Sequence, residues 1–335
     1  MPRLLIFNPS NDMALAAGVR QYVPPKTIQA MEQRMASFPL TYAQPGDVVL
    51  TDWTDTYQNL CRKCGAVLEP SPWGWSLAIK QRLLRFGVPE HLMPTDEELE
   101  RWRALSSRET AAGYITQLLN DFSVSADEPQ LVGHAMTFLK ALPSTPLQPG
   151  PWIFKSPWSS SGRGVFVSTD ESQTLTRLKG YLHRQSGFLM DRFYNRLLDC
   201  ALEYDLDREG QAHFLGFSVF HTEGNGRYGH NYIESNDSLL QRIVDALGGG
   251  HAARSLVLRL VEYHREALAA RLGKIYRGPV GIDMLVVSGN TPHDTPRLHP
   301  CIEINLRMNM GIAAIEQYKK EQNTYLSADK QNARS

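Results

Sequence analysis

Apolar and polar side chains alternate along residues 301–307, and this alternation predicts a β-strand with two unlike faces. One face carries Ile302, Ile304 and Leu306, and the other carries Glu303, Asn305 and Arg307. Thr, Lys or Ser would be the ordinary residues of an exposed strand face. Carboxylate and amide oxygens bind hard divalent cations, so this polar face predicts a magnesium site with an arginine beside it for an anion. The alternative is a solvated strand face.

A second acidic residue is predicted close to this strand. Residues 280–287 form a strongly apolar strand with Asp283 in its middle, and a loop leads from there directly to residues 301–307. If the two strands pair as a hairpin, Asp283 and Glu303 approach each other. Two like charges at close range are costly unless a cation bridges them, which again favours a metal.

Residues 1–75 predict a small α/β unit, with strands at 4–7, 47–50 and 66–68 and helices at 13–17 and 28–35. Asn11 belongs to a polar group that directly follows the first strand. Ligands bind at the carboxyl ends of strands in open α/β sheets, so Asn11 is a candidate substrate contact. The alternative is a capped turn that begins the first helix.

The middle of the chain predicts helices from residue 75 to 86 and from 97 to 105, with helical parts between 106 and 142. A proline-rich connector at 143–151 marks a boundary. Strands at 152–155 and 165–168 then form a hairpin, whose tip is Ser159, Ser160, Ser161, Gly162, Arg163 and Gly164. Backbone N–H groups of such a tip can surround an anion, and Lys155 would add a positive charge for phosphate. The alternative is a flexible loop without function.

The second half predicts a helix to about residue 185, an antiparallel block of strands at 187–193, 199–205 and 212–220, and a helix at 251–272. His264 lies on the apolar stripe of that helix and is predicted to be a core residue. The polar loop 222–238 contains three candidate substrate contacts, Arg227, His230 and Asn231. The tail beyond residue 319 is polar and is predicted to be frayed.

Composition limits the partners. The 335 residues carry 35 Lys plus Arg and 35 Asp plus Glu, so no overall field favours nucleic acid or an acidic membrane. No apolar run reaches membrane-spanning length, and the opening strand is too short for a signal peptide. Cys61 and Cys64 have the spacing of half a zinc site or a redox pair, but no second ligand pair accompanies them. We therefore expect structural thiols and a reducing, cytoplasmic location.

These residues, in this order, resemble the ATP-grasp superfamily, in particular carboxylate–amine or carboxylate–thiol ligases such as glutathione synthetase. Lys155 and the Ser/Gly-rich tip match the family's phosphate-binding lysine and loop. The segment of Met190, Asp191 and Phe193 lies where the adenine-reading strand belongs, and Asp199 lies where an acid contacts ribose. Asp283, Glu303, Asn305 and Arg307 match the metal-binding strands. Lys80 lies one helical turn beyond the family's other nucleotide lysine, and Asp stands at both nucleotide-contact positions where Glu is usual.

The resemblance implies an α+β and α/β fold, in which two α+β subdomains enclose ATP behind a small Rossmann-like pre-ATP-grasp domain. The implied ranges are residues 1–75 for that domain, 76–192 for the small subdomain with a helical insertion, 193–320 for the large subdomain and 321–335 for a polar tail. The implied cofactors are ATP and Mg²⁺, with Mn²⁺ as a substitute.

The implied activity is that of an ADP-forming ligase. A carboxylate attacks ATP to give an acyl phosphate, and an amine displaces the phosphate. Lys155 and Arg307 are the expected catalytic residues. The partners would be a small-molecule or peptide carboxylate and an amine, without nucleic acid or membrane, in a monomer or a homodimer. The alternatives are a small-molecule kinase with the same nucleotide site and a non-catalytic ATP-binding module.

Overall fold

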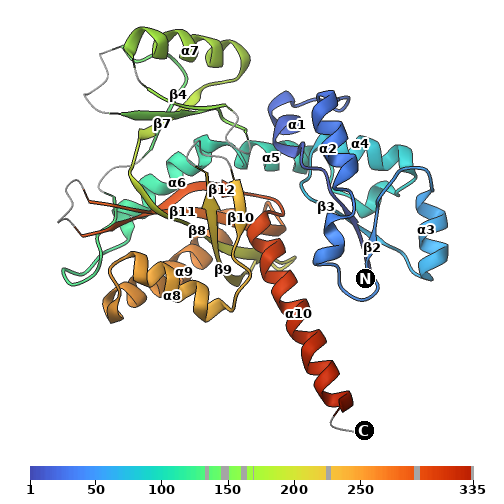
Figure 1. The fold of residues 1–335 in the computed structure, drawn as a ribbon. Coiled ribbons are helices and arrows are strands. Elements are labelled where there is room, and N and C mark those ends of the chain that lie inside the picture. Colours follow the sequence, from blue (N-terminus) through green and yellow to red (C-terminus); the bar gives the residue numbers. More distant parts are fainter. Residues whose placement is uncertain are drawn as a thin grey trace.

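The computed structural model describes residues 1–132, 136–144, 151–159, 164–168, 170–223, 228–289 and 295–332. Within these ranges the strands form three sheets, with three, four and five strands. Figure 1 shows each sheet in its own part of the molecule, with helices packed on its faces. The mixed α/β architecture predicted from the sequence is confirmed.

The amino-terminal sheet is parallel, in the order β2-β1-β3. Its strands are β1 (Arg3–Ile6), β2 (Val48–Val49) and β3 (Glu69–Pro72). Around it lie α1 (Asn11–Ala17), α2 (Lys26–Arg34), α3 (Tyr57–Cys64), α4 (Leu77–Phe86) and the 3-10 turns η1 (Phe38–Thr41) and η2 (Glu90–Leu92). Leu4 packs on one face of the sheet, against Leu83, and Leu5 packs on the other, against Trp73.

The third strand of this sheet was predicted three residues too early. Gly65 ends α3 in a left-handed conformation, and Val67 is 52% exposed in the connection that follows. Pairing with β1 begins only at Glu69. The apolar run at 66–68 therefore contributes one fully buried residue, Leu68, and no strand.

Two helices connect this unit to the rest of the chain, α5 (Asp96–Leu105) and α6 (Arg108–Asp121). Thr95 and Glu98 form a capping box at the start of α5. Ile115 and Leu118 of α6 are fully buried in the core of the five-stranded sheet. The start of α6 is thereby fixed beside the carboxyl end of the last strand, where the candidate site lies.

The four-stranded sheet has the order β4-β7-β5-β6, and all its neighbours are antiparallel. Its strands are β4 (Thr137–Leu139), β5 (Trp152–Lys155), β6 (Val165–Val167) and β7 (Phe188–Arg192). Helix α7 (Glu171–Arg184) buries Leu178 against Phe154 and Phe188. The predicted hairpin of β5 and β6 is confirmed.

The five-stranded sheet is antiparallel, in the order β10-β9-β8-β11-β12. Its strands are β8 (Arg196–Leu206), β9 (Ala212–Thr222), β10 (Tyr228–Asn231), β11 (Gly278–Val287) and β12 (Arg297–Asn305). Helices α8 (Asn236–Ala246) and α9 (Gly250–Leu272) cover one face, and His264 is fully buried there, as predicted. The predicted pairing of residues 280–287 with the last strand is confirmed.

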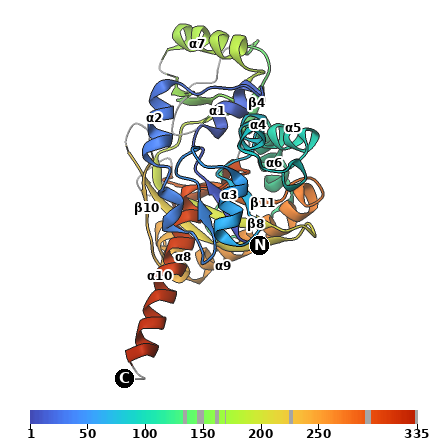
Figure 2. The same ribbon diagram turned by 90° about the vertical axis from the view of Figure 1, so that its right-hand side faces the viewer.

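Two predictions in this half were wrong. Residues 222–238 are not one polar loop, because β10 pairs with β9 and α8 begins at Asn236. The tail is not frayed, because α10 (Met310–Asn332) extends away from the body of the molecule in both views (Figures 1 and 2). The side chain of Asn309 accepts the backbone N–H of Ile312 at 2.8 Å and so caps the start of α10. Among the described residues, no helix is long and apolar enough to span a bilayer.

Candidate active site

A cavity of about 930 Å³ is lined by residues from the regions of all three sheets. The amino-terminal unit contributes Phe7, Asn11, Asp12 and Trp73, and the four-stranded sheet contributes Ile153, Lys155, Val165 and Phe166. The five-stranded sheet and the residues after it contribute Glu203, Ser218, Asp283, Glu303, Asn305 and Arg307. Its volume lies within the range typical of sites for cofactors and small molecules. The structure thus brings most of the predicted site residues that it describes to one cavity.

The two predicted metal acids lie side by side. In the antiparallel register of β11 and β12, Asp283 stands opposite Glu303. The side-chain amide of Asn305 donates to Oδ2 of Asp283 at 3.1 Å. Loss of solvation, and then the charge of Glu303, raise the pKa of Asp283 to about 7. The three oxygen-bearing side chains therefore converge on one point of the cavity wall.

Arg108, at the start of α6, is the main site residue that the sequence did not indicate. It is 4% exposed, and its Nη2 donates to both Glu303 oxygens, at 2.7 and 2.9 Å. Its Nη1 donates to the carbonyl of Ser156 at 2.6 Å and to Oγ of Ser159 at 2.7 Å. Although desolvation opposes them, the charges of Arg108 and Lys155 lower the pKa of Glu303. Arg108 thus links the acid pair to the loop after β5.

Lys155 lies at the end of β5, where it lines the cavity. Burial, and then the nearby Arg108, lower the pKa of its ammonium group, while Asp191, Glu303 and Asp283 oppose that shift. An anionic ligand would stabilise the charged form of Lys155 in these surroundings.

The loop between β5 and β6 is closed at its ends by a backbone bond from Ser156 N to Gly164 O, 2.9 Å long. Gly164 has φ +65°, and a Cβ there would lie 2.2 Å from Oγ of Ser156, so the closure requires glycine. Ser159 lines the cavity. The predicted loop residues Ser160, Ser161, Gly162 and Arg163 lie outside the described residues.

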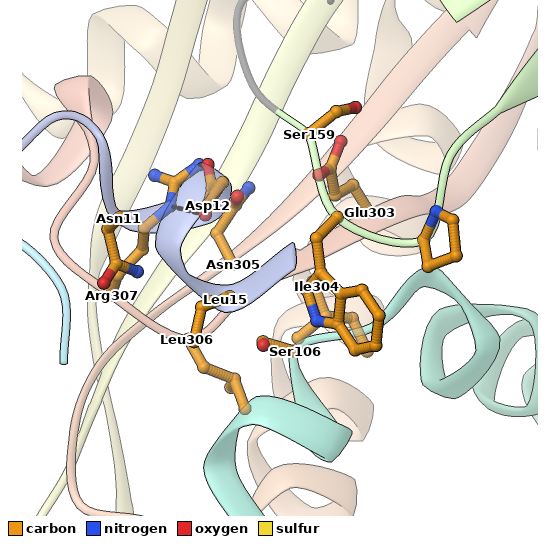
Figure 3. Close-up of a pocket in the computed structure, with 12 residues that line it drawn as sticks. Asn11, Asp12, Leu15, Ser106, Ser159, Glu303, Ile304, Asn305, Leu306 and Arg307 are labelled. Carbon is orange, nitrogen blue, oxygen red and sulfur yellow. Dashed lines mark hydrogen bonds and ion pairs between the residues drawn. The ribbon is translucent and has the colours of Figure 1, made fainter. Parts of the chain in front are cut away.

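Arg307 was predicted to lie on the strand, but the observed strand β12 ends at Asn305; Arg307 follows it and still lines the cavity. Its Nε and Nη2 donate to the two carboxylate oxygens of Asp12, at 3.1 and 3.0 Å. Figure 3 shows Asp12 on α1 facing Arg307, with Asn305 beside them and Ser159 close to Glu303. The amide of Asn11 is best oriented with its nitrogen donating to the carbonyls of Gly74 and Trp75, at 3.0 and 3.2 Å. Asn11 thereby ties α1 to the segment after β3.

Of the residues predicted to contact the nucleotide on β7, after it and on β8, only one of the four lines the cavity. Phe193 lines the cavity and is 47% exposed. Met190, Asp191 and Asp199 do not line it. Asp191 is buried 3.3 Å from Nε2 of His299, and Asp199 forms an ion pair of 3.0 Å with Arg196. Desolvation raises the pKa of Asp199, against the effect of Arg196.

The residues that lead from β7 into β8 line the cavity instead. Tyr194, Asn195 and Arg196 follow Phe193 and line the cavity. Tyr194 and Asn195 belong to the connection between β7 and β8, where side chains do not follow strand alternation, and Arg196 is the first residue of β8.

Lys80 is not in the cavity. Its Nζ contacts Oδ1 of Asp96 at 2.7 Å and Oε1 of Glu90 at 3.2 Å, and it joins α4 to the start of α5 and to η2. Desolvation opposes the increase, but hydrogen bonds to Asp96 and Glu90 raise the pKa of Lys80. Lys80 therefore stabilises the amino-terminal unit, and the structure places it apart from the predicted nucleotide residues that line the cavity.

Of the predicted substrate contacts on β10, Asn231 lines the cavity and donates to Oγ of Ser218 at 2.7 Å. His230 is exposed and stacks on His221, with ring centroids 5.6 Å apart, outside the cavity lining. Arg227 lies outside the described residues. Cys61 and Cys64 are free thiols on α3. The described part of the chain holds no group of three or more His, Cys, Asp or Glu side chains placed to bind a metal, so Asn305 is needed to complete the candidate site.

No protein family model and no curated protein matches the chain. Solved structures that resemble it include the biotin carboxylase domain of 2-oxoglutarate carboxylase from Hydrogenobacter thermophilus in complex with MgADP, ADP and bicarbonate. That domain is 12% identical, with 78% of this chain and 55% of that one covered, at a TM-score of 0.41. The N5-carboxyaminoimidazole synthetase of Staphylococcus aureus complexed with ADP is 11% identical, with 94% and 77% covered and a TM-score of 0.45. The L-amino acid ligase of Bacillus licheniformis is 12% identical, with 77% and 53% covered and a TM-score of 0.41.

Two of these three proteins, the carboxylase domain and the synthetase, are complexed with ADP. The chain spans about half the length of the carboxylase domain and of the amino acid ligase. With TM-scores of 0.41 to 0.45, the likeness does not by itself assign an activity. The function proposed below rests on the residues of the cavity.

Proposed function

We propose that the protein is an ATP- and magnesium-dependent ligase, which joins a carboxylate to an amine through an acyl phosphate. The observation that carries this proposal is the convergence of Asp283, Glu303 and Asn305 from two paired strands on a cavity that Lys155 and Arg307 also line. Metal ligands, a lysine for phosphate and an arginine for a carboxylate are the parts that phosphoryl transfer to a carboxylate requires.

The donor set fits magnesium. Mg²⁺ prefers a few carboxylate or carbonyl oxygens and keeps other positions for water and phosphate. Asp283, Glu303 and the amide oxygen of Asn305 offer hard oxygen ligands only. Their two carboxylates are held opposite each other, an arrangement that a cation stabilises. When bound there, the cation would neutralise charge between the β- and γ-phosphates of ATP.

The residues of the chain would then act by positioning and by charge. Lys155 and the backbone of the loop ending at Gly164 would hold the phosphates. Arg108 donates hydrogen bonds to Glu303, Ser156 and Ser159. With ATP bound, it would exchange some of these for hydrogen bonds to the γ-phosphate. Arg307 would hold the substrate carboxylate, for which Asp12 is the present partner.

Two bonds are formed and two are broken in the overall reaction. A carboxylate oxygen attacks the γ-phosphorus, the bond to the β-phosphate oxygen breaks, and ADP leaves with that electron pair. The amine nitrogen then attacks the carbonyl carbon, and inorganic phosphate leaves with the electrons of the broken C–O bond. The amine loses two protons in forming the neutral amide, one on changing from ammonium to amine and one after the attack.

Apolar residues of the cavity suit an adenine ring. Ile153, Val165 and Phe166 come from the four-stranded sheet, and Phe193 and Tyr194 come from the connection to β8. Planar bases bind between apolar and aromatic side chains of this kind. The predicted carboxylates at 191 and 199 would then be structural, with the polar contacts left to Asn195 and Arg196.

The test is a screen of carboxylate and amine pairs for ADP release, with products identified by mass spectrometry. Wild type should release ADP and form an amide with at least one pair. The turnover of Glu303→Gln should be at least about 100-fold lower, because losing one electrostatic contact to the transition state usually reduces turnover by about that factor. Glu223→Gln is the matched control, because Glu223 is an exposed acid on the same cavity wall. Wild-type activity in Glu303→Gln would overturn the proposal.

Other outcomes identify the competing functions. A stable phosphorylated product without a joined product would identify a kinase. Tight nucleotide binding without hydrolysis for any pair would identify a non-catalytic module.

A further inference from the structure

One acid of the cavity has no part in the proposed metal site. Glu203 lies in the middle of β8, is 1% exposed, and lines the cavity. Its Oε2 accepts a hydrogen bond of 2.7 Å from the amide of Asn309, while no described residue donates to its Oε1. A carboxylate that is buried except where it faces a cavity gains stability from a ligand that donates a hydrogen bond to it there. Glu203 is therefore a candidate ligand contact.

Two glycines make room for this carboxylate. Gly281 of β11 stands opposite Glu203, and a Cβ there would lie 2.6 Å from Oε2. At Gly311 of α10, a Cβ would lie 2.2 Å from Oε1 and 2.6 Å from Oγ of Ser218. Any larger residue at either position would displace these groups. The backbone thus leaves Oε1 and the Ser218 hydroxyl side by side at the cavity wall.

The charges that face Glu203 favour a cationic partner. Asp283 of β11 adds a like charge, and Arg307, after β12, supplies an opposite one. Arg307 is already paired with Asp12. Desolvation is the main cause that raises the pKa of Glu203 to about 8, against the hydrogen bond from Asn309. A cation that donates hydrogen bonds would stabilise the ionised form.

An apolar wall begins directly beside this acid. Met310 lies between Asn309 and Gly311 in the chain and packs against the cluster that contains Phe7 and Trp73. The ring centroids of Phe7 and Trp73 are 5.1 Å apart, and Met35, which directly follows α2, packs against the same cluster. Phe7, Trp73, Met35 and Met310 all line the cavity. Aromatic rings bordered by flexible methionines accept apolar groups of varied shape.

We propose that this part of the cavity binds the acceptor substrate, and that the acceptor is a primary amine with an apolar body. Its ammonium group donates to Oε1 of Glu203 and to Ser218, and its body lies against the wall of Phe7, Trp73, Met35 and Met310. The inference rests on the proposed ligase function. Glu203 takes a proton from the ammonium group, and the neutral nitrogen then attacks the carbonyl carbon of the acyl phosphate. The C–O bond breaks, phosphate leaves with its electron pair, and the second amine proton passes to phosphate or water.

Calorimetric binding of phenethylamine tests the subsite without turnover. Titrations at a pH above about 8, where Glu203 is ionised, use wild type, Glu203→Gln and the matched control Glu223→Gln. Each is measured alone and with Mg²⁺ and a non-hydrolysable ATP analogue. We expect wild type and Glu223→Gln to bind alike, and Glu203→Gln to bind about 10- to 100-fold more weakly, the usual loss for one charged hydrogen bond.

Two analogues separate the contribution of the ammonium group to binding from that of the apolar body. We expect 2-phenylethanol, which lacks the charge, and ethylamine, which lacks the body, each to bind wild type at least tenfold more weakly. Equal binding by Glu203→Gln and wild type, equal binding of the alcohol, or no binding of phenethylamine in either state would overturn the inference. ADP release with a carboxylate but no amine binding would overturn this inference alone. Amine binding without nucleotide binding would instead overturn the ligase function.

Discussion

The ion pair between Arg108 and Glu303 provides a sharp test of the site's electrostatics. Arg108→Met keeps most of the side-chain volume but removes the charge that lies 2.7 Å from Glu303. Glu303 and Asp283 are then two adjacent carboxylates, and among the described residues Lys155 and Arg307 are the cations that still act on Glu303. Breaking a buried pair by removing one partner costs about 3–5 kcal/mol. In metal-free buffer we expect the Tm to fall by roughly 5–10 °C.

Magnesium should reverse part of this loss, because the acid pair is the proposed metal site. With a Kd of about 1 mM, 10 mM Mg²⁺ would stabilise the variant by about 1.4 kcal/mol, roughly a third of the loss. Wild type should respond less, since Arg108 already neutralises Glu303. Scanning calorimetry with and without Mg²⁺ measures both effects.

Arg259→Met is the matched control. Arg259 donates to both oxygens of buried Glu128, at 3.0 and 2.9 Å, and Glu128 is outside the cavity lining. We expect it to lower the Tm without any response to Mg²⁺. If the two variants responded alike to Mg²⁺, or if Arg108→Met were as stable as wild type, the metal assignment of the acid pair would be wrong.

Three further predictions follow from particular side chains. Because the pKa of Asp283 is raised to about 7, protons compete with the cation, and Mg²⁺-dependent nucleotide affinity should fall about tenfold per pH unit below that value; a flat profile between pH 5 and 7 in calorimetric titrations would contradict this. Burial lowers the pKa of His264 to about 3, so at this residue only the unfolded chain gains a proton as the pH falls from 6.5, and the stability difference between wild type and His264→Gln in urea melts should shift against wild type by about 1.4 kcal/mol per pH unit in that range; a pH-independent difference would contradict this. Gly164→Ala should weaken ATP binding at least tenfold with little change in Tm, because its Cβ would meet Ser156 at 2.2 Å and open the loop; unchanged affinity in the same titrations would show that the loop does not hold phosphate.

The acid pair was predictable because it depends on local pattern. Strand alternation assigns Glu303 and Asn305 to one face, and a hairpin brings Asp283 opposite them. Arg108 was not predictable in this way. It contacts Glu303 across 195 positions of the chain, from a helix whose apolar pattern says nothing about that polar end.

The errors have a common physical cause, which is that tertiary partners decide the role of a charged residue. Lys80 has the residue type and approximate position of a nucleotide contact, but Asp96 and Glu90 use its charge. Asp191 and Asp199 match the positions of nucleotide acids, but both are buried beside other residues, His299 and Arg196. Sequence spacing cannot distinguish an acid that faces a cavity from one that faces a core partner.

The α10 helix shows the limit of composition as a guide. Its carboxyl-terminal half is polar, which suggested a frayed tail, but Gln, Glu, Lys and Ala all favour helix. Capping by Asn309 and burial of Ile312 and Ala313 fix its start beside the cavity. The same segment supplies Met310 and Gly311 to the candidate acceptor subsite.

Electron paramagnetic resonance of Mn²⁺ in the presence of ATP measures the central claim directly, because it counts nucleotide-dependent cations bound to the protein. Wild type should bind Mn²⁺ with ATP well above the level in ATP alone, and Glu223→Gln should match it. Glu303→Gln should lose this binding. Equal Mn²⁺ binding by Glu303→Gln and wild type would contradict the assignment of Asp283, Glu303 and Asn305 as the site that carries the nucleotide's metal.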